Sequence, residues 1–252
     1  MTAVGCEHVG FGEIAYFSSP SPDHPEHNED AAVVIADPAW CVLAICDGAG
    51  GTARGDRAAS MTIEILQQTL RTTTPPGNVR AAVLDAIEAA DDGIRRELSG
   101  ALATIGVFIL DGPTARAISV GDSICAVIGG RGKLKYRSVA HGPTGFAEEA
   151  GLLDESEALA HEERHLVSNM LGLPGMRVEV GRPLHLAQRD TALVASDALF
   201  DNLRFDEITD LARRRPLAAA VESLAERARQ RMEGDGRVSH ADDLSILAFR
   251  RT

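Results

Sequence analysis

The sequence has no excess of basic residues and no closely paired cysteines. Its 25 Lys and Arg residues against 37 Asp and Glu residues give a formal net charge of −12. This balance excludes a broad nucleic-acid-binding face, because repulsion from the phosphate backbone would be uncompensated. None of the four cysteines stands in a C-x-x-C pattern. We therefore expect free thiols rather than a zinc site or a disulfide framework.

Long apolar runs are also missing. No stretch of about 18 consecutive apolar residues is present, as a transmembrane helix would require. The first residues do not show the charged and apolar regions of a secretory leader. We therefore expect a cytoplasmic protein that binds no membrane. A chain of 252 residues is long enough to bury its own hydrophobic core without disulfides or structural metal.

Apolar periodicity divides the chain into grouped strands and paired helices. Runs at 31–36 and 40–46 predict a strand–turn–strand unit. Helical spacing follows over 52–73 and again over 78–100, where Asn78 is the expected N-cap. Further strands are predicted over 102–139, 176–186, 191–196 and 242–250, with helices over 198–215 and 217–234. This order predicts an α+β fold, an antiparallel β-sandwich with a helical layer on each outer face.

Carboxylates stand at the ends of the predicted strands. Five of them, each beside a small residue, are Asp30, Asp47, Asp122, Asp197 and Asp242. Each taken alone is typical of a turn or a helix cap, and Asp197 would suit the cap of a helix beginning at Ala198. Together they predict a cation site, because clustered carboxylates repel one another unless a cation lies between them. Carboxylate oxygens favour Mg²⁺ or Mn²⁺ over zinc.

The stretch CDGAGG, residues 46–51, combines an acid with a glycine-rich turn. Glycine-rich turns after strands often bind phosphate, which Asp47 would repel. A metal ion at Asp47 would reverse the local charge and attract phosphate. Gly48 would let the backbone approach closely enough for its carbonyl oxygen to serve as a further ligand. Two such ions would activate a water molecule for attack on phosphorus.

Five motifs in order resemble those of the type 2C, metal-dependent (PPM) protein serine/threonine phosphatases of the bacterial type. They are NED at 28–30, CDGAGG at 46–51, VGDS at 120–123, SDALFD at 196–201 and DDLSILAF at 242–249. The resemblance implies a four-layer αββα sandwich, read as a single catalytic domain over 1–252. It also implies a flap insertion at about 141–169, a segment that varies in the family and is linked to substrate choice.

The same resemblance implies a role for each acid. Asp47 matches the carboxylate that bridges two metal ions, and Gly48 matches the carbonyl ligand. Glu29 and Asp30 match acids that hold metal-bound waters. Asp197 and Asp242 match direct ligands of the metal ion on the other side of the site. Asp122 matches an acid that helps to bind a third ion in bacterial relatives. The implied cofactors are thus two Mg²⁺ or Mn²⁺ ions, and the resemblance leaves open whether a third ion binds.

Three positions depart from the family pattern. The arginine that binds the substrate phosphate in relatives is replaced by Pro25, with His24 and His27 nearby. Either histidine would serve as a weaker phosphate contact or as general acid, or both are solvated loop residues. Ala198 replaces a glycine of the family motif, a change that adds only a methyl group. The sequence LATIG at 102–106 replaces a common bacterial motif and removes no catalytic group.

Two functions follow from these residues. The first is an active phosphatase that removes phosphate from Ser and Thr of a phosphorylated protein, as a monomer, with a cognate kinase as a candidate partner. The second is a pseudophosphatase, or regulatory module, that recognises a phosphorylated partner without turnover. The complete set of acids favours the first, and the missing arginine favours the second.

Overall fold

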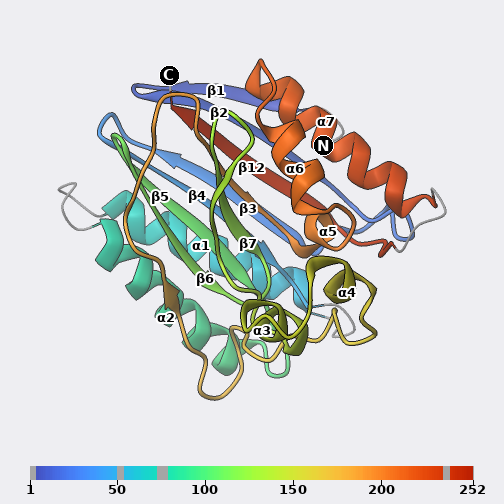
Figure 1. Ribbon diagram of the computed structural model, residues 1–252. Helices are drawn as coiled ribbons and strands as arrows, with labels where there is room; N and C mark the ends of the chain where they lie inside the picture. The colour runs from blue at the N-terminus through green and yellow to red at the C-terminus, as the bar shows by residue number, and fades with distance from the viewer. Residues whose placement is uncertain (1–3, 50–53, 73–78, 235–238, 252) are drawn as a thin grey trace.

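The chain forms two antiparallel sheets that stack face to face, with helices on both outer faces (Figure 1). This computed structural model describes residues 4–49, 54–72, 79–234 and 239–251. The arrangement confirms the predicted four-layer α+β sandwich. Within the described residues, no helix has both the length and the apolar character needed to cross a bilayer.

The first sheet has the strand order β10-β6-β5-β4-β3, and β9 also pairs with β6. Its strands are β3 (Asp30–Ala36), β4 (Trp40–Asp47), β5 (Ile105–Asp111), β6 (Thr114–Val120), β9 (Glu179–Val180) and β10 (Leu184–His185). Strand β4 is buried on both faces except at Asp47, which explains why its sequence is a continuous apolar run rather than an alternation. The buried strand β4 therefore ends in an acidic residue, Asp47, at one end of the sheet.

The second sheet has the order β1-β2-β12-β11-β7-β8. Its strands are β1 (Gly5–Val9), β2 (Gly12–Ser19), β7 (Ile124–Ile128), β8 (Leu134–Arg137), β11 (Thr191–Ala195) and β12 (Leu244–Arg251). The hairpin of β1 and β2 had no counterpart in the sequence prediction. Strand β12 lies between β2 and β11 and pairs antiparallel with both. The C-terminal strand thus occupies the middle of this sheet.

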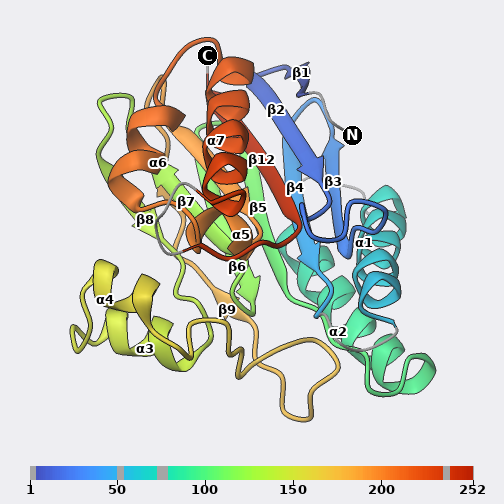
Figure 2. The ribbon, with the colours of Figure 1, turned by 90° about the vertical axis from the view of Figure 1, so that its right-hand side faces the viewer.

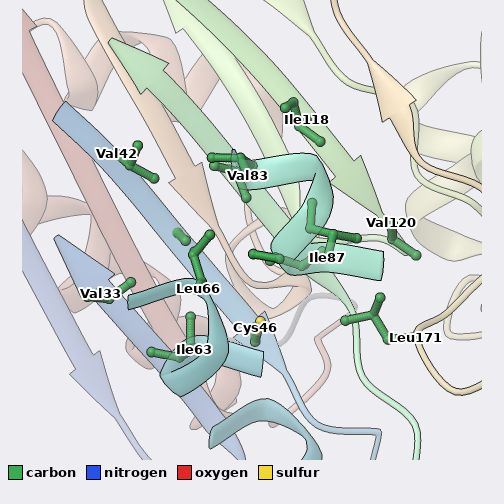
Figure 3. Close-up of a cluster of buried hydrophobic side chains, with 14 of the residues drawn as sticks. Val33, Val42, Cys46, Ile63, Leu66, Val83, Ile87, Ile118, Val120 and Leu171 are labelled. Carbon is green, nitrogen blue, oxygen red and sulfur yellow. The ribbon is translucent and has the colours of Figure 1, made fainter. Parts of the chain in front are cut away.

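Helices α1 (Gly55–Thr72) and α2 (Val79–Glu97) cover the first sheet (Figure 2). Ile63 and Leu66 of α1 lie with Val83 and Ile87 of α2 over the strand residue Val42 (Figure 3). These are the apolar positions that recur at helical spacing in the sequence. The expected N-cap of α2 at 78 lies outside the described residues.

Helices α5 (Asp197–Phe200), α6 (Phe205–Ala212) and α7 (Leu217–Met232) cover the second sheet. The helix predicted over 198–215 is therefore two helices, separated by a short turn at 201–204. A third apolar layer lies between the sheets, where Leu43 and Phe108 meet Val194 and Phe249. The two sheets pack against each other through these apolar side chains.

Residues 141–169, called here the flap segment, leave the sandwich and return to nearly the same point. They contain α3 (Pro143–Glu149) and α4 (Glu155–Ala160). The two ends are hydrogen-bonded, with Asn169 Nδ2 lying 2.8 Å from His141 Nδ1. The Ser168 amide also donates to the His141 carbonyl at 2.8 Å. The ends of the segment are therefore fixed to each other.

Candidate metal centre

Five predicted acids lie at one end of the sandwich, each at the end of a strand or in the adjoining connection. Asp30 begins β3 and Asp47 ends β4, and the two are cross-strand partners. Asp122 follows β6, Asp197 is the first residue of α5, and Asp242 lies two residues before β12. The helix cap beside Asp197 is Ser196, so the alternative of Asp197 as N-cap is wrong.

Thr104 connects Asp47 with the turn that carries Asp122. Its amide donates to the Asp47 carbonyl at 2.8 Å, and its hydroxyl oxygen lies 3.3 Å from the Asp47 amide nitrogen. The same hydroxyl is 2.7 Å from the Ser123 hydroxyl. Gly121 has φ of +98°, and a Cβ there would lie 2.6 Å from the Thr104 side chain. Glycine is therefore required for this turn.

Ser196 brings Asp197 and Asp242 together. It is fully buried, and its hydroxyl donates to the Asp243 carbonyl at 3.2 Å while accepting from the Ser245 amide at 3.0 Å. The last residues of β11 and the first of β12 are thus joined just beyond their ladder. This link places the start of α5 beside the connection that holds Asp242.

Three of the acids converge closely enough to share an ion. Asp47, Asp122 and Asp197 each offer a carboxylate oxygen, and these three oxygens lie within 4.8 Å of one another. Asp122 Oδ1, Asp197 Oδ1 and both carboxylate oxygens of Asp30 are buried and have no hydrogen-bond partner among the described residues. Buried acceptors without donors indicate a cation. The all-oxygen donor set fits a hard divalent ion such as Mg²⁺ or Mn²⁺.

Burial and mutual repulsion raise the pKa values of these carboxyl groups in the metal-free protein. Burial raises the pKa of Asp47 well above its usual range, and Asp30 and Asp122 add to the rise. Burial is also the main cause for Asp197, with a further contribution from Asp47. The pKa of Asp122 rises to about 7, through burial and the nearby Asp201. A divalent cation would reverse these effects.

A cavity of about 320 Å³ opens onto the cluster. Glu29, Gly48 and Asp242 line it together with Asp47, Asp122 and Asp197. Burial raises the pKa of Glu29. Asp30 is not among the lining residues, and burial raises its pKa well above the usual range. All the predicted metal residues except Asp30 therefore line the cavity. Asp30 is the cross-strand neighbour of Asp47 and does not line it.

Gly48 is needed for packing at this edge. A Cβ at this position would lie 2.3 Å from the backbone of Gly55, the first residue of α1. The Gly48 amide donates to the Glu29 carbonyl at 3.2 Å. The start of α1 thus packs against the backbone that follows Asp47, and this close approach requires glycine whether or not the Gly48 carbonyl binds an ion.

The two histidines singled out from the sequence lie on the loop between β2 and β3. His24 and His27 are both exposed, and neither is among the residues that line the cavity. His27 Nε2 lies 3.6 Å from Glu29 Oε1. The imidazoles that do line the cavity are those of His165, from the flap segment, and His240.

Several residues that shape this site were not predicted from the sequence. Asp243 accepts from the Ser21 amide at 2.7 Å and from the Glu29 amide at 2.5 Å, and so holds the loop that carries Glu29. The flap residue Arg164 lies 3.8 Å from Asp201, and its Nη2 donates to the Ser239 carbonyl at 3.2 Å. The doublet Asp242-Asp243 was a sequence signal for the contacts of Asp243. Nothing in the sequence pointed to the contacts of Arg164.

Comparison with known proteins agrees with this geometry. A sequence model of the family described as Protein phosphatase 2C matches residues 24–235. The chain belongs to the protein phosphatase 2C family. Members of this family are metal-dependent hydrolases of phosphoproteins, so the chain is a phosphoprotein phosphatase by family. No curated protein sequence matches it.

Solved phosphatase structures share the fold. The S. agalactiae serine/threonine phosphatase is 21% identical with a TM-score of 0.82, and the match covers 96% of this chain and 100% of that one. The Mycobacterium tuberculosis phosphatase PstP/Ppp is 22% identical with a TM-score of 0.77, covering 96% and 99%. The catalytic domain of PstP in complex with two manganese ions is 20% identical with a TM-score of 0.73, covering 98% and 99%. These likenesses confirm the predicted sandwich.

Proposed function

We propose that this protein phosphatase 2C family member removes phosphate from phosphoserine and phosphothreonine in proteins, using two Mg²⁺ or Mn²⁺ ions. The observation that carries the proposal is the convergence of Asp47, Asp122 and Asp197, whose carboxylate oxygens lie within 4.8 Å of one another. The two manganese ions of the PstP catalytic domain support the choice and number of ions.

Each acid has a distinct proposed role. Asp47 would hold both ions, with the Gly48 carbonyl as a further ligand. Asp197 and Asp242 would hold an ion from the opposite sheet. Glu29 and Asp30 would orient water, and Asp122 would help to hold a third ion. When bound, the ions supply water activation at neutral pH and neutralise charge on the phosphate oxygens.

The remaining residues of the chain position these acids and shape the cavity. Asp243 fixes the loop that ends at Glu29. The flap segment contributes Leu166 and Val167 to the cavity lining, which reduces access of water on that side. Asn202 accepts a hydrogen bond from the His240 amide at 3.1 Å and donates to its carbonyl at 2.7 Å. His240 is therefore held at the cavity by its backbone.

The contact that replaces the family arginine is a histidine in this proposal. His24 and His27 were the candidates from sequence, but both are exposed outside the lining of the cavity. His165 and His240 line it and are better placed to contact a phosphate oxygen. A single imidazole contact is weaker than a bidentate guanidinium, so we expect a high KM for small phosphate esters.

Hydrolysis of para-nitrophenyl phosphate tests the proposal. We expect activity with Mn²⁺ or Mg²⁺, none with EDTA, and a loss of at least about 100-fold in kcat/KM for Asp47→Asn and Asp197→Asn. Asp111→Asn, at an exposed position ending β5, is the matched control and should retain activity. If the wild type binds Mn²⁺ calorimetrically but hydrolyses neither this ester nor a phosphothreonine peptide, the chain is a pseudophosphatase.

Three further features belong to the proposal. The protein acts in the cytoplasm as a monomer, and a kinase that phosphorylates the same substrate is its functional partner. Activity on phosphoserine and phosphothreonine peptides should exceed activity on a phosphotyrosine peptide of the same sequence. Sedimentation of the purified chain checks the oligomeric state.

A further inference from the structure

A second cavity lies at the other end of the sandwich. It has a volume of about 620 Å³ and is lined by Glu13, Gln188, Arg189, Arg215, Pro216, Arg250 and Arg251. We call it the arginine pocket. Arg250 and Arg251 are the last residues of β12, whereas Asp242 lies just before its first. Both ribbon views place the end of β12 and the flap helices α3 and α4 at opposite ends of the molecule (Figures 1 and 2).

Two of the four arginines are fixed by backbone carbonyls. Arg250 is only 3% exposed, and its guanidinium donates to the carbonyls of Arg214 at 2.7 Å and Ala212 at 2.5 Å. Arg251 donates to the Leu186 carbonyl at 2.8 Å. Carbonyl groups satisfy the N–H donors without neutralising the charge. These two side chains therefore form a rigid, positively charged floor.

The other two arginines are exposed at the rim. Among the described residues, no hydrogen bond or ion pair engages the guanidinium of Arg189 or Arg215. Arg189 lies in a tight turn with φ of +71°. The buried Asp190 holds this turn by accepting from the Ala187 amide at 2.8 Å and from Lys135 at 2.5 Å. Arg189 is thus presented from a fixed backbone, with its side chain available to a ligand.

The pocket concentrates positive charge in an acidic protein. Four arginines against one glutamate leave about three net positive charges in the lining, although the whole chain has a net charge of −12. Glu13 lies 3.9 Å from Arg250. Burial lowers the pKa of Arg250, Glu13 opposes this, and Arg215 lowers it further. The arginines therefore repel one another, and a bound anion would relieve the repulsion.

Helix α7 adds to this field. It begins at Leu217, directly after the lining residue Pro216. Its N-cap provides no side-chain hydrogen bond, and its first turn contains no acidic residue. The amide groups and dipole of this 16-residue helix are therefore not neutralised at its N-terminus.

We propose that the arginine pocket binds a phosphorylated segment of a protein partner. Guanidinium groups bind phosphate through paired N–H donors, and the volume exceeds what one free phosphate ion needs. The lining has no aromatic ring to stack on a nucleotide base. A membrane surface is disfavoured because the large apolar side chains exposed among the described residues, Phe146, Leu152 and Leu166, all lie on the flap segment. This binding does not depend on turnover at the metal centre.

Fluorescence anisotropy tests the proposal with the full chain carrying Asp47→Asn, which prevents hydrolysis. The probe is a labelled peptide with two phosphoserines, and its serine counterpart is the control peptide. We expect Arg189→Ala/Arg215→Ala to weaken binding of the phosphopeptide at least tenfold. The matched control, Arg71→Ala/Arg182→Ala, removes the same charge at two exposed positions that do not line the pocket and should leave affinity within twofold.

Three results would overturn the proposal. Equal affinity of the pocket variant and its parent would show that the peptide binds elsewhere. Equal loss in the control variant would show an effect of net charge alone. Stronger binding of orthophosphate, ADP or phosphatidylserine vesicles than of the phosphopeptide, lost in the pocket variant, would assign the site to another phosphate source. Because binding is measured without turnover, none of these results bears on the proposed phosphatase activity.

Discussion

Asp30 and Asp47 stand directly opposite each other in the antiparallel pair of β3 and β4, at the end of both strands that faces the metal centre. Like charges at directly opposed positions destabilise a sheet, and here both pKa values are raised, mainly by burial. The pair is therefore costly in the metal-free protein and useful only when a cation lies beside it.

Asp30→Asn should stabilise the metal-free protein. The substitution removes a buried charge that has no hydrogen-bond partner among the described residues, so we expect the free energy of unfolding to rise by at least about 1 kcal/mol at pH 8. Urea unfolding in EDTA measures this change. Asp111→Asn, at an exposed strand end, is the control. A less stable Asp30→Asn protein would mean that the carboxylate has a favourable partner in the metal-free state.

Stability of the metal-free protein should fall as pH rises. The pKa of Asp122 is about 7 in the folded protein, with burial as the main cause, and about 3.9 in an unfolded chain. The folded state therefore binds more protons between these values, and this contribution to stability, present below about pH 4, is lost as pH rises through about 7. The pKa values of Asp47 and Asp197 are also raised, so deprotonation of these two residues should likewise lower stability as pH rises.

Thermal unfolding in EDTA at pH 5.5 and pH 8 measures this effect. We expect a lower Tm at pH 8, and a smaller difference for Asp122→Asn. Saturating Mn²⁺ should remove most of the difference, because ion binding favours the deprotonated acids. An unchanged Tm across this range in EDTA would contradict the raised pKa values.

Asp243 should matter for the loop that carries Glu29 even though it lies outside the proposed ligand set. Asp243→Ala leaves the amides of Ser21 and Glu29 without their acceptor, which should cost about 2–3 kcal/mol with Mn²⁺ bound. Asp243→Asn keeps one acceptor oxygen, so we expect about half that loss. Urea unfolding in Mn²⁺ gives the ranking, and an Ala variant as stable as the wild type would show that water replaces the carboxylate.

Gly48→Ala tests the close contact between the strand end and helix α1. The new Cβ would lie 2.3 Å from the Gly55 backbone, so one of the two segments must move, at a cost of about 1–3 kcal/mol. We also expect weaker Mn²⁺ binding by calorimetry, because the shifted backbone adjoins Asp47. Gly10→Ala is the control, since a Cβ there would lie 3.5 Å from its nearest neighbour. Normal stability and Mn²⁺ affinity in Gly48→Ala would refute the packing role.

The flap segment should contact protein substrates through its exposed apolar side chains. Leu152 is 78% exposed, and a contact that buries part of it would be worth about 1 kcal/mol. Leu152→Ser should therefore lower kcat/KM for a phosphoprotein about fivefold, with no change for para-nitrophenyl phosphate. Glu149→Ala, also exposed on this segment, controls for general disturbance. An equal loss on both substrates for Leu152→Ser would indicate altered catalysis instead.

The sequence predicted those parts of the fold whose pattern is local. The apolar run of β4 and the helical spacing of α1 indicated their structures because burial decides both. The hairpin of β1 and β2 was missed, because β1 (GCEHV) is largely exposed and has no apolar run. A single helix was predicted where α5 and α6 stand, because the buried Leu203 in the turn between them continues the apolar spacing of a helix.

The acids of the site were predictable because each ends a strand, and sheet geometry brings strand ends together. Contacts between distant segments were not predictable in this way. Asp243 and Ser21 are 222 positions apart, and the arginine pocket combines the end of β12 and the start of α7 with the turn at 187–190. No local pattern distinguishes these residues from solvated surface residues. The exposed position of His24 and His27 likewise depends on how the 20–29 loop folds.

The placement of the acids on both sheets has a mechanical consequence. Asp30 and Asp47 belong to the sheet of β3 and β4, whereas Asp197 and Asp242 adjoin the sheet of β11 and β12. Ions shared between these groups would cross-link the two layers at this end, in addition to the hydrogen bond that Asp243 accepts from the Glu29 amide. Chelation should therefore let the sandwich splay at this end, with faster amide exchange in β4 and β11 near the acids. The opposite end, where Arg251 of β12 donates to the Leu186 carbonyl just after β10 of the other sheet, should remain closed.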